Sequence, residues 1–176
     1  MTEGTQGVTM RRIATAIGYS PGSIYNAIGD LEAVMRRTNA ATLERLVERL
    51  ESVIGECRPA TPTIETAKSI AQAYVDYVLQ NSRLWAALLE RPPQPGEPVP
   101  DGYVAPRSRL IEIVATVIAP LFPDRVARQR AVVALWAALQ GVASLAIGGN
   151  FQFMPIELDA TDIACTIVSR YLTGTE

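Results

Sequence analysis

The chain of 176 residues is predicted to be all-helical, and three observations carry this prediction. Apolar residues recur at helical spacing through long segments, strand-like alternation is nearly absent, and proline and glycine residues separate the periodic segments. Apolar residues make up 48% of the chain, which is enough to build the core of one or two compact units.

The first predicted helix begins after Thr9, whose side chain suits an N-cap, and ends at Gly18, which tolerates the left-handed conformation of a helix C-cap. Four apolar residues recur at i, i+3, i+4 and i+7, namely Met10, Ile13, Ala14 and Ile17. This spacing predicts that they share a buried face and that Arg11 and Arg12 face outward.

A second short helix is predicted for residues 21–28, because Ser20 is a favoured N-cap and Pro21 a favoured first helical residue. Ile24 and Ile28 are expected to pack inward. The residues left free to face a DNA groove or a phosphate are Gly22, Ser23, Tyr25 and Asn26. Two short helices joined by a glycine turn are the parts of a helix-turn-helix, so this segment predicts DNA binding.

Asp30 is expected to cap a long amphipathic helix that ends near Glu56. Its apolar stripe consists of Leu31, Val34, Met35, Leu43, Leu46, Leu50 and Ile54. Capping residues and prolines delimit later helices at about 61–81, 83–91, 103 or 106 to 121, 124–147, and 159 or 161 to 172. Residues 92–100 are predicted to form a Pro-rich loop.

The N-terminal segment resembles the tetracycline-repressor (TetR) family of transcriptional regulators. The residues that match the family pattern are Thr9, Ile13, Ala14, Gly18, Tyr19, Ser20 and Tyr25. The resemblance implies a helix-turn-helix DNA-binding head, residues 1–45, followed by a helical regulatory and dimerisation domain, residues 46–176.

Three positions after the pattern depart from the family: Ala27, Ile28 and Leu31 stand where a His or Tyr, a Phe and a Lys are usual. The first and last positions usually contact phosphates, so two electrostatic anchors are lost. Family members also carry a helix before the Thr, whereas only residues 1–8 precede Thr9 here. A late start assignment, a truncated chain and a reduced DNA-binding head remain open explanations.

A second stretch, around Trp136, is similar to a subgroup of the family in which a Trp is followed four and five residues later by His and Gly. Here those positions are Gln140 and Gly141. Glutamine keeps a polar group that forms hydrogen bonds but does not exchange a proton near neutral pH.

The resemblance implies a homodimer that binds a palindromic double-stranded operator, with recognition helices about 34–36 Å apart in successive major grooves. The expected DNA-contacting residues are Thr9, Arg11, Arg12, Ser20, Pro21, Gly22, Ser23, Tyr25 and Asn26. Repression that a small apolar effector relieves is the family's usual behaviour.

An apolar effector pocket is one interpretation of the aromatic residues in the body. Its expected lining is Tyr74, Tyr77, Trp85, Leu88, Leu89, Tyr103, Trp136 and Gln140. Ordinary core packing is the alternative for each aromatic residue, and the Pro-rich loop beside Trp85 favours the pocket because long loops often cover ligand sites.

The last two helices are candidates for self-association, because they carry small and branched residues suited to close helix packing. The expected dimer residues are Val133, Ala137, Ser144, Ile163, Ile167 and Tyr171, with Val132 and Val168 nearby. Part of this surface is expected to face the chain's own core.

Composition and charge exclude several classes of function. The net charge is −2, and residues 1–58 carry as many acidic residues as arginines, so no basic stripe marks a general nucleic-acid coat. The chain has no histidine, which excludes Ser-His-Asp and Cys-His catalysis, and no cofactor or metal is expected. Cys57 and Cys165 fit reduced thiols of a cytoplasmic protein, and Gln140 and Gly141 interrupt the longest apolar run, which argues against a membrane span.

Two alternatives remain. One is a helical dimer that binds a small molecule or a partner and has weak or lost operator binding, in line with the uncharged second helix. The other is a helical enzyme, whose chemistry would need carboxylates; the candidates Asp76, Glu90 and Glu112 are scattered on solvated faces.

Overall fold

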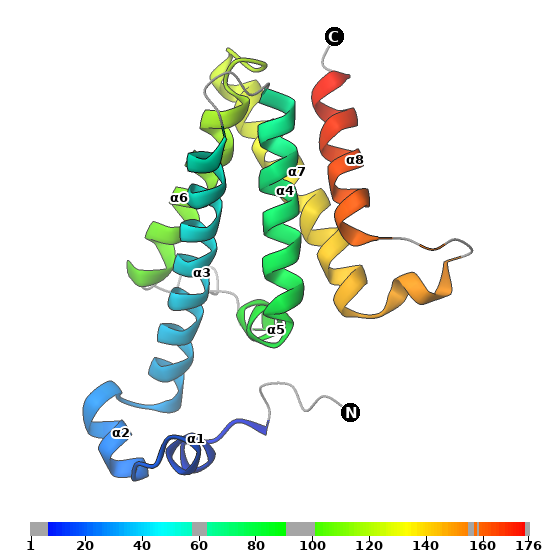
Figure 1. Cartoon of the computed structure of the whole chain (residues 1–176). Helices are drawn as coiled ribbons and strands as arrows, with labels where there is room; N and C mark the ends of the chain where they lie inside the picture. Colours follow the sequence, from blue (N-terminus) through cyan, green and yellow to red (C-terminus); the bar gives the residue numbers. More distant parts are fainter. Residues whose placement is uncertain (1–6, 58–62, 91–100, 155–156, 158, 175–176) are drawn as a thin grey trace. The chain divides into compact units, whose positions relative to one another are not determined.

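The computed structural model describes residues 7–57, 63–90, 101–154, 157 and 159–174, with Glu90 and residues 101–103 described by their backbone only. These ranges contain helices and no strand, which confirms the predicted all-helical fold. The elements are α1 (Met10–Ile17), α2 (Pro21–Ile28), α3 (Leu31–Glu56), α4 (Thr63–Gln80), α5 (Ser82–Glu90), α6 (Asp101–Ile118), α7 (Arg125–Ile147), η2 (Asn150–Phe153) and α8 (Ala160–Thr173) (Figure 1).

Most helix ends lie where the sequence predicts them. The side chains of Asp124 and Asp159 cap α7 and α8 by accepting backbone N–H groups. Two features differ from the prediction. The helix α6 begins at Asp101, before Tyr103, and holds Pro106 inside it, at the cost of one backbone hydrogen bond. The 3-10 helix η2 follows α7 where only a helix end was expected. The predicted Pro-rich loop, residues 92–100, lies outside the described residues.

The chain divides into two compact units. The first unit contains residues 1–44 and 83–106, and the second contains residues 45–82 and 107–176. The head that the sequence predicts, residues 1–45, therefore falls almost entirely in the first unit, whereas α3 and α6 each contribute residues to both.

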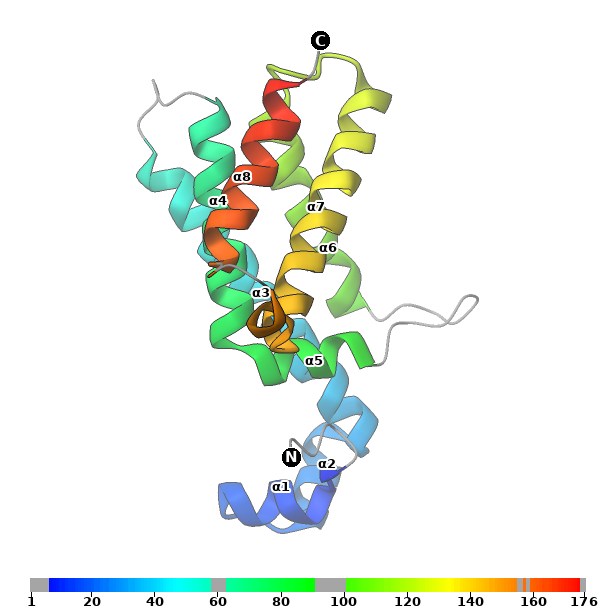
Figure 2. The same ribbon diagram turned by 90° about the vertical axis from the view of Figure 1, so that its right-hand side faces the viewer.

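The core of the second unit lies among α4, α7 and α8, which run side by side (Figures 1 and 2). Its fully buried side chains include Leu46 from α3, Val75 and Val78 from α4, Ile118 from α6 and Leu172 from α8. Burial of such aliphatic side chains is the main source of folding free energy, so this core holds the second unit together.

The helix α7 is long and apolar enough to cross a membrane by length and composition alone. Its buried residues lie on one side, at Ala131, Leu135, Leu139 and Val142, and this side packs against α4 and α8. The same length and composition occur in core helices of globular domains.

Candidate functional site

Local hydrogen bonds build the turn between α1 and α2. The Thr9 hydroxyl accepts the Arg12 backbone N–H at 3.2 Å, which caps α1. Gly18 adopts a φ of 76° and closes α1 by donating its N–H to the carbonyls of Ala14 and Thr15. Only glycine adopts this left-handed conformation without strain, so Gly18 fixes the change of direction between the helices.

Two serines shape the start of α2. The Ser20 hydroxyl accepts the Ser23 backbone N–H at 3.0 Å, and the two hydroxyl oxygens lie 2.8 Å apart. Sequence reasoning predicted the cap but missed the hydroxyl pair, which uses part of the hydrogen-bonding capacity of both side chains. Asp30 accepts the Ala33 N–H at 2.7 Å and caps α3 as predicted.

The second helix presents a polar face to solvent. Ile24 is buried, with 5% of its surface exposed, and Ile28 is half-buried. Tyr25 is 64% exposed, and Asn26 is exposed beside it. The inward and outward residues of α2 therefore lie as the sequence predicts.

One residue of the predicted buried face of α1 is not buried. Ala14 is buried and Met10 and Ile13 are half-buried, but Ile17 is 55% exposed. Periodicity places Ile17 on the same face as these residues, but Ile17 lies at the last turn of a short helix and keeps more than half of its surface exposed. Tyr19, which follows the turn, is 66% exposed.

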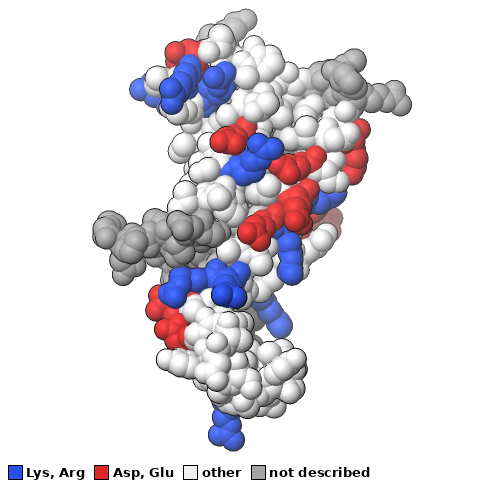
Figure 3. Space-filling view, turned by 90° about the vertical axis from the view of Figure 1, so that its left-hand side faces the viewer, with Lys and Arg blue, Asp and Glu red and all other residues white. Residues whose placement is uncertain are grey.

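All nine predicted DNA-contacting residues are exposed, so each is accessible to a duplex. The Arg12 side chain is partly committed, because its guanidinium donates to the Gly7 carbonyl at 2.7 Å. Charged side chains are sparse over α1 and α2 on the face that Figure 3 shows, in contrast to the mixed charges elsewhere. The helix α2 itself carries no charge, so contacts from it would be hydrogen bonds and packing rather than ion pairs.

In the second unit, one polar pair joins α4 to α7. The Tyr74 hydroxyl donates to Gln140 Oε1 at 2.8 Å, and Gln140 Nε2 donates to the Ser144 hydroxyl at 3.1 Å. Burial raises the pKa of Tyr74 well above its usual range, so the phenol stays protonated. The structure thus brings together two of the residues predicted to line a pocket.

The other predicted lining residues differ in exposure. Trp85 and Leu88 are buried and belong to the first unit, as does Leu89, which is exposed. Trp136 is 47% exposed, and the Arg107 guanidinium lies 5.6 Å from the centre of its ring, a cation–π contact that sequence reasoning missed. Tyr77 is half-buried, and the side chain of Tyr103 lies outside the described residues.

The predicted dimer residues form an outward strip on α7 and a partly covered face on α8. Val133 is 59% exposed, and Ala137 and Ser144 are also exposed. Ile163 and Ile167 are half-buried, and the Tyr171 ring stacks on Phe122 with 6.4 Å between ring centres. The nearby Val132 and Val168 are buried in the chain's own core, as expected of part of this surface.

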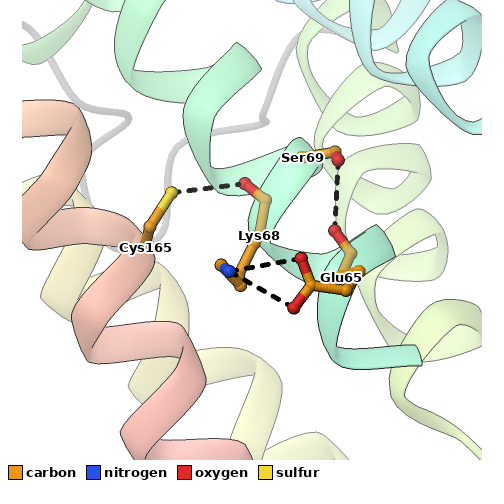
Figure 4. A network of polar contacts seen from close by, with 4 residues as sticks. All are labelled: Glu65, Lys68, Ser69 and Cys165. Carbon is orange, nitrogen blue, oxygen red and sulfur yellow. Dashed lines mark hydrogen bonds and ion pairs between the residues drawn. The ribbon is translucent and has the colours of Figure 1, made fainter. Parts of the chain in front are cut away.

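The two cysteines are free and half-buried. The Cys165 thiol on α8 lies 3.8 Å from the Lys68 carbonyl oxygen on α4, and burial raises the pKa of this thiol (Figure 4). The Lys68 ammonium pairs with Glu65 at 3.2 Å. No cluster of three potential metal ligands occurs within the described part of the chain.

Comparison with known proteins identifies the family. A family model described as the C-terminal domain of tetracycline-repressor-like proteins matches residues 67–167, which is more than half of the chain. The chain therefore belongs to the TetR family, whose members are transcriptional regulators and not enzymes. A curated relative, an uncharacterised HTH-type transcriptional regulator from Bacillus subtilis named YobS, is 27% identical over 87 residues, which are 49% of this chain and 44% of that protein. The chain thus matches less than half the length of this relative.

Solved structures share the fold along nearly the whole chain. A protein of unknown function from Rhodococcus sp. RHA1 matches with a TM-score of 0.76 and 19% identity over 98% of this chain and 86% of the other. The TetR family regulator PfmR from Thermus thermophilus matches with a TM-score of 0.68 and 18% identity over 97% of this chain and 91% of the other. These matches agree with a helix-turn-helix head on a helical body.

Proposed function

We propose that this protein is a one-component transcriptional regulator of the cytoplasm, a homodimeric repressor that releases its operator when a small apolar effector binds. The observation that carries the proposal is the pair α1–α2, in which Gly18 sets the turn, Ile24 anchors α2 and Tyr25 and Asn26 face solvent. This is the arrangement in which a recognition helix enters the major groove.

Direct readout is assigned to Tyr25 and Asn26, and backbone contact to Thr9, Arg11 and Arg12 at the start of α1. Asparagine pairs well with adenine in the major groove, while arginine pairs with phosphate or guanine. The N-terminus of α2, formed by Ser20, Pro21, Gly22 and Ser23, approaches the sugar-phosphate backbone.

Dimerisation is assigned to the exposed strip on α7 that contains Val133, Ala137 and Ser144, together with α8. A two-fold pair through this strip would present two copies of α2 to a palindromic site. The variant Val133→Asp should shift the protein from dimer to monomer in analytical ultracentrifugation, because a carboxylate would be buried without a partner. Since Val133 is 59% exposed in the single chain, its folding should be unaffected.

Effector binding is assigned to the surroundings of Tyr74, Tyr77 and Gln140, all of which belong to the second unit. The Tyr74 and Gln140 pair is the support for a polar contact within a mainly apolar lining.

The test is fluorescence anisotropy with duplexes from the protein's own promoter region and a scrambled duplex, at two salt concentrations. Specific binding should weaken steeply with salt, and Asn26→Ala should weaken specific binding by about 1–3 kcal/mol while sparing non-specific binding. Arg11→Gln should lower the salt slope by about one. The matched control is Phe153→Ala, which changes an exposed aromatic residue of the second unit and should alter neither the specific affinity nor the salt slope.

A second candidate function is a TetR-like helical dimer that binds a small molecule or a partner and has weak or lost operator binding. The observations that favour it are the uncharged α2 and the exposure of Ile17 and Tyr19. A folded dimer that shows no preference for promoter DNA at either salt concentration would replace the first proposal with this one.

A further inference from the structure

A polar groove lies on the second unit, between the C-terminal half of α3 and α4. Its volume is about 350 Å³, within the range of small-molecule sites. The groove is lined by Arg49, Val53, Glu56, Cys57, Ser69, Gln72, Ala73 and Asp76. The Tyr74 and Gln140 pair is absent from this lining, so the groove is separate from the apolar effector site proposed above.

The charged residues of the lining are divided between the two ends of the groove. Because α3 and α4 run in opposite directions (Figure 1), Arg49 and Asp76 lie at one end of the groove and Glu56 and Ser69 at the other. Arg49 and Glu56 are seven residues apart on one helix, which is two turns or about 10 Å. The apolar side chains of Val53 and Ala73 lie between the two ends.

The charged groups at the first end do not neutralise each other. Arg49 forms no ion pair with any described residue, although Asp76 lies at the same end of the groove. Asp76 is held from the other side, because the Thr161 hydroxyl on α8 donates to its Oδ1 at 3.2 Å. A guanidinium and a carboxylate that share one end without pairing can hold a carboxylate and an ammonium of the same ligand.

The second end is acidic. The Ser52 hydroxyl donates to Glu56 Oε1 at 3.0 Å, which leaves the other carboxylate oxygen for a ligand. The nearby cation Lys68 is paired with Glu65, and the Ser69 hydroxyl donates to the Glu65 carbonyl at 3.1 Å (Figure 4). The three charged residues of the lining sum to a charge of −1, from one arginine and two acidic residues.

We propose that this groove binds a free basic α-amino acid, of the class of lysine and arginine. The ligand's carboxylate lies against Arg49, its α-ammonium against Asp76, and its terminal cation against Glu56. The methylene chain lies over Val53 and Ala73. The net charge of +1 on such an amino acid complements the charge of −1 that the lining residues carry.

Isothermal titration calorimetry with the whole chain tests this assignment, with L-lysine and L-arginine as probes. Three analogues each lack one group: norleucine lacks the terminal cation, cadaverine lacks the carboxylate, and Nα-acetyl-L-lysine lacks the α-ammonium. The probes should bind saturably, and each analogue should bind at least about tenfold more weakly, because each loses a charge-assisted contact.

Variants locate the site. Arg49→Gln and Glu56→Gln should each weaken the binding of L-lysine at least about tenfold. The affinity for cadaverine, which has no carboxylate, should not weaken in Arg49→Gln. The matched controls Arg45→Gln and Glu44→Gln change exposed residues of α3 outside the lining and should leave the affinity unchanged. Circular dichroism checks that every variant is folded.

The proposal is overturned if the folded wild-type chain shows no saturable heat with either amino acid at millimolar concentration. It is also overturned if norleucine binds as well as L-lysine, or if the controls weaken binding as much as the groove variants. None of these measurements involves DNA, so the outcome is independent of operator binding.

Discussion

The helix-turn-helix segment and the core of the second unit are held in shape by different forces. In α1 and α2 only Ala14 and Ile24 are fully buried, and the geometry rests on two side-chain caps and the left-handed Gly18. The second unit instead buries rows of aliphatic side chains along α4, α7 and α8. A helix-turn-helix segment can therefore be specified by local sequence, while the helical body needs packing between helices that are distant in sequence.

The largest effect is expected from a cavity in the second unit. Leu46 has no exposed surface, so Leu46→Ala should lower the free energy of unfolding by about 2–5 kcal/mol, measured by urea denaturation followed by circular dichroism. Val126→Ala removes an aliphatic group that is 54% exposed and should change stability by less than about 0.5 kcal/mol. Similar losses for the two variants would contradict the view that burial holds this unit.

A smaller effect is expected from the loss of a cap in the first unit. Ser20→Ala removes the acceptor of the Ser23 N–H and should destabilise α2 by about 1 kcal/mol. Hydrogen exchange of the α2 amides should accelerate about fivefold, whereas the amides of α4 should exchange as before. The control is Ser69→Ala, which also removes a serine hydroxyl but from the interior of α4, where it caps no helix.

The polar pair of the second unit should contribute about as much as one cap. Tyr74→Phe removes the hydrogen bond to Gln140 and should cost about 0.5–1.5 kcal/mol near neutral pH. Burial raises the pKa of Tyr74 in the folded chain, so its contribution is complete below the pKa of an unfolded tyrosine, about 10, and is lost as the pH rises above that value.

The pH dependence separates this role from simple packing. Above pH about 10 the unfolded state releases the phenolic proton while the folded state retains it, which favours unfolding. Wild-type stability should therefore fall more steeply there than that of Tyr74→Phe, and Tyr19→Phe, at a residue that is 66% exposed, should follow the wild type. Parallel curves for wild type and Tyr74→Phe would show that Tyr74 does not resist ionisation in the folded chain.

The same contrast explains what the sequence could predict. Caps and turns depend on neighbouring residues, so Thr9, Gly18, Ser20 and Asp30 take the roles that their identities predict. Helical periodicity likewise predicts which side of α2 faces inward.

Features that depend on distant residues could not be predicted in this way. Periodicity gives the face on which Ile17 lies but not whether anything covers it. The Tyr74 bond to Gln140 joins residues 66 positions apart, and the contact of Arg107 with Trp136 joins two helices. The groove between α3 and α4 depends on how these helices align, which no local pattern encodes.

The smallest expected effect compares the same type of surface ion pair in the two units. Glu32 accepts from Arg36 at 2.7 Å in the first turn of α3, and Glu65 pairs with Lys68 at 3.2 Å in the first turn of α4. Glu32→Gln and Glu65→Gln should each cost about 0.2–0.5 kcal/mol of stability, because exposed pairs are well solvated, and high salt should reduce both losses.

Hydrogen exchange tests the comparison directly. If local structure holds the helix-turn-helix and burial holds the body, Glu32→Gln should accelerate hydrogen exchange at the start of α3. Glu65→Gln should then leave the hydrogen exchange of the buried half of α4 unchanged. Equal acceleration at both places would show that the two units share one source of stability.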